Sequence, residues 1–320
     1  MLTGLDHVII GVHDLYEAWQ AFQQLGLAVS GGGNHPSGGT ANRIIVIEET
    51  YLELIAVREP AEAQQSMLDR LALGEGLLNF VLASNDMQAD SQAIRERGIA
   101  VLGPDAGELR VGDGRSRGWS RTNVERPDLT QHYPFLIQHD SSGDERRFRL
   151  AGWQTPPLHP LGVSKVLSVT LAVDDLGEAT QRFQRIYGLD PSPTFTGEPD
   201  GWEAMLTAFR LGDSGQSFEL AVPLPFAGEA QDEAIDLLTE PGALARHLSL
   251  YGESLCRVTL GVRDLAASRR FLDEHSITYT YRDEPRACLW IHPQQACGAT
   301  LLLYEHDPER VISAGGQPEE

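Results

Sequence analysis

The stretch "GLDHVIIGVHDL", residues 4–15, decides the fold, because the same phrase returns three more times along the chain. The later copies are "GLLNFVLASNDM" (76–87), "KVLSVTLAVDDL" (165–176) and "SLCRVTLGVRDL" (254–265). In each copy an apolar run of strand length leads to an aspartate, and a stretch with helical spacing follows: Asp14, Asp86, Asp175 and Asp264. Aspartate is typical of a helix N-cap and glycine of the position just past a helix end. Three of the stretches end in glycine and the fourth in serine: Gly26, Gly98, Gly188 and Ser276.

Three short β-rich runs follow each of these helical stretches, so each unit is predicted to be βαβββ. A single unit of this kind cannot bury both faces of its sheet, and we expect the units to pair. Helical inserts join the first unit to the second and the third to the fourth, whereas "SSGDERRFRLAGWQTPPLHPLGVS" between the second and third is rich in Pro, Gly and Ser and predicts a linker. The prediction is an α+β protein with a first domain at 1–140 (modules 1–57 and 76–140), a linker at 141–163, a second domain at 164–307 (modules 164–223 and 254–307) and a polar tail at 308–320.

Composition narrows the class of ligand. The 320 residues carry a net charge of −21, which argues against nucleic acid and anionic membrane surfaces as partners, since these need clustered Lys and Arg. No apolar stretch approaches the ~18 residues of a membrane span, and the N-terminus has no signal-peptide pattern. The three cysteines lack CxxC spacing. We expect a cytoplasmic protein with a small-molecule ligand.

The chain resembles the vicinal oxygen chelate superfamily, which includes glyoxalase I, extradiol dioxygenases and bleomycin- and fosfomycin-resistance proteins. The resemblance is carried by "LDHVIIGVHDL", "GGGNHPSGGTANRIIV" and "YLELIAV". It is strongest in the first 57 residues and weakest in the second unit, and the superfamily pattern covers roughly residues 3–306. The resemblance implies that the four modules pair into two glyoxalase-like cup-shaped domains. It further implies a divalent metal inside a cup, held by the first and last strands of each unit.

Carried over position by position, the resemblance gives the first cup His7, Glu53, Asn79 and Gln138. It gives the second cup Ser168, Glu219, Arg257 and Glu305. The resemblance therefore implies that His7, Glu53 and Gln138 hold Zn, Ni, Mn or Fe in the first cup. We expect no metal in the second, because Arg257 would neutralise Glu219 and Glu305 there as an internal ion pair.

Each of the first-cup residues has a second interpretation. His7 is either an imidazole ligand or a hydrogen-bonded cavity histidine without metal. Glu53 would bind metal, act as a general base with a raised pKa, or face solvent while its neighbours face the core. An iron triad of two histidines and a carboxylate needs a second histidine. The mapped positions supply no second histidine, and the candidates would have to come from elsewhere: His35 in the loop "GGGNHPSGGT", His132 or His139. Ring-cleaving dioxygenase chemistry therefore ranks behind enolisation.

Two further segments are candidates for binding substrate. The glycine-rich loop lacks the GK[ST] ending of a nucleotide P-loop and is predicted to form a flexible lip, with Asn42 and Arg43 entering the next strand. If "RSRGWSRTN" is a strand, four of its side chains share one face by period two: Arg115, Arg117, Trp119 and Arg121. Such a face suits an anionic, partly apolar ligand. The alternative is an exposed sheet edge protected by charge.

The leading hypothesis is a metal-dependent lyase or isomerase of glyoxalase type, acting on a small oxygenated anion. Its substrate contacts would be Asn79, His35, Arg43, Arg117, Trp119 and Arg121. The rival hypothesis is a metal-free protein that binds or sequesters a small molecule. In a third alternative the second cup is a scaffold or a dimerisation partner, which would give a homodimer.

Overall fold

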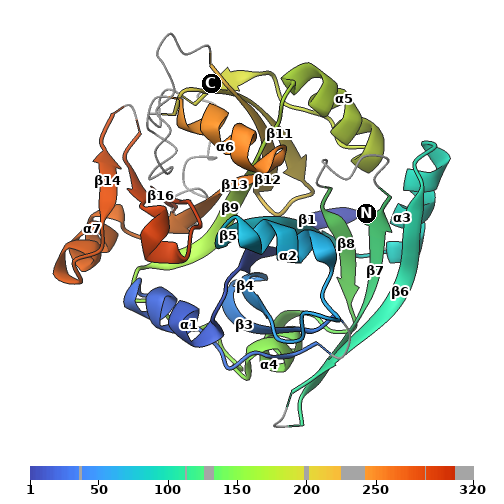
Figure 1. Cartoon of the computed structure of the whole chain (residues 1–320), viewed down its shortest axis with the longest axis horizontal. Helices are drawn as coiled ribbons and strands as arrows, with labels where there is room; N and C mark the ends of the chain where they lie inside the picture. The colour runs from blue at the N-terminus through green and yellow to red at the C-terminus, as the bar shows by residue number, and fades with distance from the viewer. Residues whose placement is uncertain are drawn as a thin grey trace, which may run out of the picture.

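The computed structural model describes residues 1–35, 38–111, 114–125, 133–197, 202–224, 242–284 and 286–306. It contains two eight-stranded sheets, with strand orders β2-β3-β4-β1-β5-β8-β7-β6 and β10-β11-β12-β9-β13-β16-β15-β14. Each sheet therefore combines two of the βαβββ units, the first with the second and the third with the fourth. In Figure 1 the first half, coloured blue to green, lies below the second half, coloured yellow to red. The predicted α+β fold of paired cups is confirmed.

The strands of the first sheet are β1 (Leu2–Gly11), β2 (Gly33–Asn34), β3 (Thr40–Ile47), β4 (Thr50–Val57), β5 (Gly76–Ser84), β6 (Val101–Arg110), β7 (Ser116–Val124) and β8 (Phe135–His139). Those of the second are β9 (Val163–Ala172), β10 (Phe195–Thr196), β11 (Ala204–Leu211), β12 (Gln216–Pro223), β13 (Ser254–Val262), β14 (Tyr279–Arg282), β15 (Cys288–Ile291) and β16 (Leu301–Glu305). In both sheets the first strands of the two units pair antiparallel at the centre, β1 with β5 and β9 with β13.

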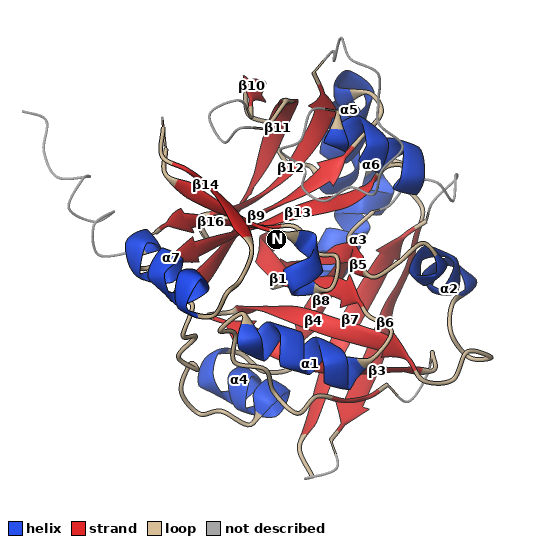
Figure 2. Cartoon of the chain, turned by 60° about the vertical axis from the view of Figure 1, so that its left-hand side comes forward, coloured by secondary structure: helices blue, strands red, loops and turns tan. Residues whose placement is uncertain are grey.

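The four predicted helices are α1 (Leu15–Gln24), α3 (Met87–Glu96), α5 (Leu176–Tyr187) and α7 (Leu265–Glu274). Each begins after its predicted aspartate, whose carboxylate accepts a backbone N–H of the first turn. The residues expected to end them have positive φ, and even the exception, Ser276, adopts φ 56°. The helix boundaries read from the sequence are therefore confirmed. Helices lie at the periphery and strands in the centre (Figure 2).

Two expectations differ from the structure. "LAVS" (27–30), the first of the three β-rich runs of the first unit, is not a strand, and the short strand β2 lies later, at Gly33–Asn34. The segment expected as a linker contains a helix, α4 (Gly143–Ala151), which packs Leu150 and Ala151 against Ile44 and Val46 of β3. A linker rich in Pro, Gly and Ser at its ends can still bury an apolar helix face in its middle. This helix matters below, because it carries Arg146 to the candidate site.

The two halves share one hydrophobic core, to which β1, β5, β9 and β13 all contribute buried side chains. Gln216 at the start of β12 joins the halves, since its side-chain oxygen accepts the N–H of Leu5 at 2.9 Å and its nitrogen donates to the Thr50 hydroxyl at 2.9 Å. Three shorter helical segments complete the described chain: α2 (Gln65–Ala72), α6 (Ala243–Tyr251) and the 3₁₀ turn η2 (Pro293–Ala296). None of the helices in the described ranges is long and apolar enough to cross a membrane. The predicted polar tail, 308–320, lies outside the described residues.

Candidate functional site

A β-bulge in β1 builds the first part of the candidate site. The pairing with β5 advances by two residues on β1, from Leu5 to His7, while it advances by one on β5. Asp6 is the extra residue, and a bulge changes the side-chain alternation locally. Both Asp6 and His7 are buried, and the His7 Nδ1 and Asp6 Oδ1 atoms lie 2.6 Å apart.

Glu53 of β4 is the centre of a polar cluster in the first cup. Its Oε2 lies 3.7 Å from His7 Nε2 and its Oε1 lies 3.6 Å from His35 Nε2. The Asn42 side-chain amide donates a short hydrogen bond to the same Oε1. His35 is oriented from its other side, because its Nδ1 lies 2.8 Å from the Thr40 hydroxyl. The structure thus brings together three predicted site residues, His7, Glu53 and His35.

The electrostatics of Glu53 correct one expectation. Burial raises the pKa of this carboxyl, but His7, His35, the Asn42 hydrogen bond and Arg117 together lower it below its usual value. Glu53 is 6% exposed and ionised, held by surrounding positive and donor groups. The expectation of a base with a raised pKa is therefore wrong. The expectation that Glu53 faces solvent is also wrong.

Asp6 fixes the far side of His7. Its Oδ2 accepts a hydrogen bond from Arg146 at 2.7 Å, and its Oδ1 lies 3.2 Å from His139 Nε2. Burial raises the pKa of Asp6, but Arg146, His139 and His7 hold it well below its usual range. The His7 ring stacks on Tyr51 with centroids 4.6 Å apart. These contacts leave the Nε2 edge of His7 as the one that faces Glu53.

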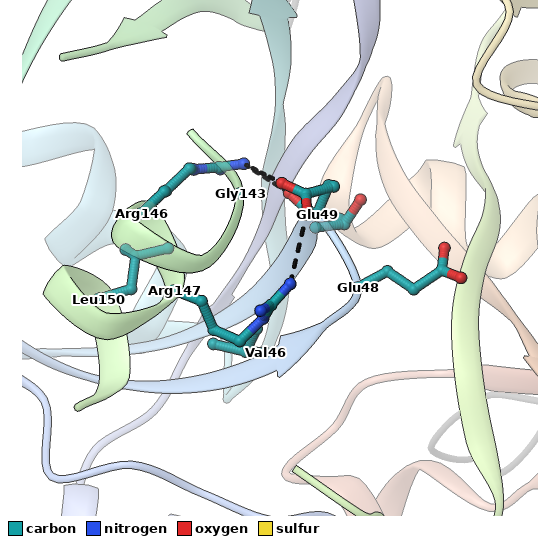
Figure 3. A pocket seen from close by; sticks show the side chains of 8 residues that line it. Val46, Glu48, Glu49, Gly143, Arg146, Arg147 and Leu150 are labelled. Carbon is teal, nitrogen blue, oxygen red and sulfur yellow. Dashed lines mark hydrogen bonds and ion pairs between the residues drawn. The ribbon is translucent and has the colours of Figure 1, made fainter. Parts of the chain in front are cut away.

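Arg146 comes from α4. Figure 3 shows Arg146 and Arg147 pointing from this helix toward Glu49 at the β3–β4 turn. The pocket beside them has a volume of about 10 Å³, which suits at most one water molecule. We therefore assign α4 a structural role at the edge of the first cup, where it supplies the partner of Asp6.

Arg117 of β7 is the cation of this cluster. It is 4% exposed, and among the described residues its buried Nε and Nη1 atoms have no hydrogen-bond partner. Its charge lowers the pKa of both Glu53 and His35. Burying an ionised group whose donors stay unsatisfied costs several kcal/mol. An anion in the cup would satisfy those donors.

The other members of the predicted arginine face have different surroundings. Arg121 is exposed, lies 5.7 Å from the Phe135 ring centroid, and also lowers the pKa of His35. Trp119 is half-buried and covers Gly107 of β6, where an added Cβ would lie 2.3 Å from the indole nitrogen. Arg115 precedes the strand and donates to the Phe148 carbonyl at the end of α4. Of the four, Arg117 is the one that is buried and lowers the pKa of Glu53.

Gln138, predicted as a third metal ligand, does not join His7 and Glu53. Its side-chain oxygen accepts the Met87 N–H at the start of α3 and its nitrogen donates to the Asn85 carbonyl. Its cross-strand partner is Ser120, whereas that of His139 is Trp119. Side chains alternate between the faces of a strand, so Gln138 points to the helix-covered face. The prediction for Gln138 is therefore wrong, because the next residue along β8, His139, is the one that faces into the cup.

Arg43 and Asn79 also make contacts outside the cluster. The Arg43 guanidinium lies 5.5 Å from the Trp19 ring centroid of α1, on the outer face of β3. The expectation that Arg43 binds substrate in the cup is therefore wrong, and its neighbour Asn42 faces Glu53 instead. The Asn79 side chain is used by backbone groups, since it donates to the Tyr133 carbonyl and accepts the Phe80 N–H. His132 lies outside the described residues.

The metal expectation can be tested against these side chains. Two imidazole nitrogens and a carboxylate are donor types that suit Zn, Ni, Mn or Fe. Within the described ranges, however, no group of three or more His, Cys, Asp or Glu side chains is arranged so that it could hold a metal ion. The arrangement in the first cup does not fit a metal ion as it stands.

Several residues of the site were not recognised as such in the sequence. Nothing in the sequence indicates that Asp6 belongs to the site, because a residue one position before His7 in a strand normally faces the opposite side of the sheet. Asn42 lies in β3, and the alternation of side chains places it, rather than Arg43, on the same face as Ile44 and Val46. Arg146 lay in the presumed linker.

The second cup is filled differently. Arg257 of β13 donates to Glu219 of β12 at 2.8 Å, and its guanidinium lies 4.1 Å from the Trp202 ring centroid. The predicted ion pair with Glu219 is present, while Glu305 accepts the Leu265 N–H at the start of α7. Trp202 and Trp290 are fully buried in the cluster that fills this cup.

Comparisons with known proteins agree with this architecture. A family model described as "Glyoxalase-like domain" matches residues 5–187, more than half of the chain. No curated protein matches the sequence. A hypothetical protein from Staphylococcus aureus has a similar crystal structure (TM-score 0.64, 15% identity, 94% of this chain and 99% of that chain covered).

Two further solved structures are similar over different lengths. A mutant of 4-hydroxymandelate synthase from Streptomyces coelicolor matches with a TM-score of 0.56 and 12% identity, covering 98% of this chain and 97% of that one. Methylmalonyl-CoA epimerase from Mycobacterium tuberculosis matches 49% of this chain and 97% of its own at 20% identity, with a TM-score of 0.38. At these identities, the two structures that match nearly the whole chain show the shared fold alone.

Proposed function

The chain belongs to the glyoxalase-like domain family, and on that premise we propose that its first cup is the active site of an isomerase or lyase that acts on a small oxygenated anion. The observation that carries the proposal is Arg117, a buried guanidinium with two nitrogens that have no hydrogen-bond partner in the part of the chain that the structure describes. A substrate carboxylate is the simplest group that would satisfy both the charge and the donors.

Glu53 would accept the proton in this reaction. Its pKa is low while His7, His35 and Arg117 act on it without an opposing ligand. A substrate anion beside Arg117 would offset part of that positive charge and raise the pKa of Glu53 toward the range in which a carboxylate is an effective base. The base would thus strengthen when the substrate is bound.

The proposed step breaks a C–H bond next to a substrate carbonyl. The proton moves to Glu53, the electron pair of the C–H bond forms a C=C bond, and the π pair of the carbonyl moves to its oxygen. His7 and His35 are placed to donate a proton or hydrogen bond to that oxygen, because their Nε2 atoms lie 3.7 and 3.6 Å from the Glu53 carboxylate. Return of the proton to another carbon gives an isomerase, and loss of a leaving group gives a lyase.

Anion binding is the first test. Small 2-oxocarboxylates should raise the Tm of the wild-type protein, and Arg117→Met should abolish the shift. Arg210→Met is a matched control, because Arg210 is an exposed arginine on β11 of the second sheet. Equal shifts in the Arg117→Met variant and in the wild type would refute the anion site.

Proton transfer is tested separately. The same carboxylates are incubated with the protein in D₂O, and exchange of the hydrogen next to the carbonyl is followed by proton NMR. Wild-type protein should accelerate exchange, and Glu53→Gln should lose at least a hundredfold of that acceleration, the usual contribution of a general base. Binding without any exchange would instead favour the second candidate function.

That second candidate is a metal-free protein that binds or sequesters its ligand. It is favoured by the low pKa of Glu53 and by the hydrogen bond from Asn42, which already occupies one carboxylate oxygen. A group so fully engaged is suited to holding a structure in place.

A divalent metal in the first cup stays a prediction, with His7, Glu53 and His35 as the donors present. Metal content by mass spectrometry, in protein purified without a His-tag, is compared with that of a His7→Ala, Glu53→Ala double variant. About one equivalent in the wild type that is lost in the variant would support the prediction. No metal in either, after addition of Zn²⁺, Ni²⁺, Mn²⁺ and anaerobic Fe²⁺, would contradict it.

A further inference from the structure

A second cavity lies at the boundary between the two halves, away from the Glu53 cluster. Its volume is about 110 Å³, close to the ~150 Å³ of an engineered cavity that binds benzene. Its lining comes from both halves and includes Arg70, Leu77, His247, Tyr251, Leu255 and Thr300. Figure 1 shows the two helices involved, α2 and α6, one above the other in front of β5 and β13. Small-molecule sites occur preferentially at such boundaries.

His247 gives this cavity a fixed hydrogen-bond acceptor. The residue is 8% exposed, and its Nε2 lies 2.9 Å from the Ser254 hydroxyl. That hydroxyl donates its own hydrogen to the Gly252 carbonyl at 3.0 Å, so it must accept from His247 and the ring proton is assigned to Nε2. Nδ1 then carries a lone pair, and within the described chain it has no partner. Burial, with a contribution from Arg70, lowers the pKa of His247 to about 3, so the ring stays neutral.

Arg70 gives the same cavity a fixed cation. Its Nη1 donates to the Gly74 carbonyl at 2.9 Å, and its guanidinium lies 4.2 Å from the Tyr251 ring centroid. The His247 and Tyr251 rings are also in contact, with centroids 4.9 Å apart. One wall therefore combines a held guanidinium with a neutral imidazole acceptor. Leu77 and Leu255 supply apolar lining.

We propose that this cavity is a second ligand site, which takes a small carboxylate that carries a hydroxyl or amino donor next to it. The carboxylate would face Arg70, and the neighbouring donor would bond to His247 Nδ1. A simple anion would leave the imidazole lone pair unsatisfied, and a neutral alcohol would leave the guanidinium without a direct ion pair, because Glu75, which also lines the cavity, accepts the His13 N–H instead. Because the lining comes from both halves, the bound ligand would also tie the halves together.

The test uses glycolate as the probe, on the full chain carrying Arg117→Gln so that the first cup no longer offers its anion site. Acetate lacks the donor and glycolamide lacks the charge, which makes them matched controls. Glycolate should bind and raise the Tm, and both controls should bind about tenfold more weakly, the value of one hydrogen bond or more. His247→Phe on the same background should abolish glycolate binding. Equal affinity for the three probes, or an unchanged affinity in the His247→Phe variant, would overturn the proposal.

The two sites of the protein are separated by comparing backgrounds. Glycolate binding that is seen in the wild type and lost in Arg117→Gln belongs to the first cup, which overturns this proposal and leaves the proposed function standing. Binding retained in Arg117→Gln supports the second site whatever the first cup does. If His247→Phe does not fold, a crystal of the wild type soaked in glycolate decides. The hydroxyl should lie within hydrogen-bond distance of His247 Nδ1, and an empty cavity would overturn the proposal.

Discussion

The two cups use the same places in the sheet for different chemistry. In the first, Glu53 pairs with Ile9 of β1, and Ile9 pairs with Asn79 of β5. In the second, Glu219 pairs with Thr170 of β9, and Thr170 pairs with Arg257 of β13. Asn79 and Arg257 therefore occupy matching positions, as do the two glutamates. What differs is the residue at this matching position: Arg257 forms an ion pair with Glu219, whereas Asn79 carries no charge that could pair with Glu53.

The difference shows what makes one cup a candidate site. Arg257 neutralises Glu219 and packs against Trp202, so the second cup is closed by internal contacts. In the first cup Asn79 turns to the backbone, and Glu53 is balanced by imidazoles and by Arg117, whose donors are not all satisfied. A buried cation held in a direct ion pair stabilises structure, whereas one that forms no such pair with a described residue is suited to an anionic ligand.

The largest expected loss of stability comes from removing the ion pair of the second cup. Arg257→Met should lower the free energy of unfolding by about 3 kcal/mol, because it leaves the largely covered Glu219 carboxylate without its cation and with the Thr170 hydrogen bond alone among its contacts with the described residues. The double variant Arg257→Met, Glu219→Leu should recover most of that loss. Urea denaturation measures both. A single variant as stable as the wild type would mean that this ion pair is not what closes the cup.

The next largest effect is the pH dependence of stability that His247 causes in the second half. The pKa of His247 is lowered from 6.5 to about 3, so its contribution to stability is complete above pH 6.5 and is lost as the pH falls toward 3. Between pH 6.5 and 5 this amounts to about 2 kcal/mol. His247→Gln should remove that slope in urea unfolding. His35→Gln in the first cup should remove less, because Glu53 opposes the effect of burial there.

A smaller effect of opposite sign is expected in the first cup. Arg117→Met should leave the free energy of unfolding unchanged or raise it by about 1 kcal/mol, because it removes a buried charge with unsatisfied donors. The measurement is again urea denaturation, without added anions. A loss as large as that of Arg257→Met would show that the two cups do not differ in the way described.

The smallest effect should be equal in the two halves. Asp14→Ala and Asp264→Ala each remove a helix N-cap whose carboxylate accepts backbone N–H groups, and each should cost about 1 kcal/mol. Thermal unfolding of the two variants checks this. A clear inequality would mean that the two corresponding helices differ in their contribution to the fold.

Much of the candidate site depends on which side chains of each strand face the cup, and the sequence does not determine this for each residue. His7 and Glu53 were named from the resemblance, and the structure places them in one cluster with His35. Gln138 and Arg43 were assigned to the cup and face the helices instead, each one residue away from a side chain that faces inward, His139 and Asn42. A shift of one residue in a strand exchanges its faces, so a small error in register reverses such an assignment.

By itself the sequence determined the four units, their helix boundaries and their pairing, because N-cap aspartates, positive-φ positions and apolar strand runs act over a few neighbouring residues. Only the tertiary structure decided which charges meet. The bulge at Asp6, the fold of the His35 loop over Glu53 and the docking of α4 with Arg146 each bring together residues far apart in the chain. These contacts follow from burial and packing of whole elements, which local sequence does not encode. The same is true of Arg117, whose unsatisfied donors exist only because the sheet around it buries them.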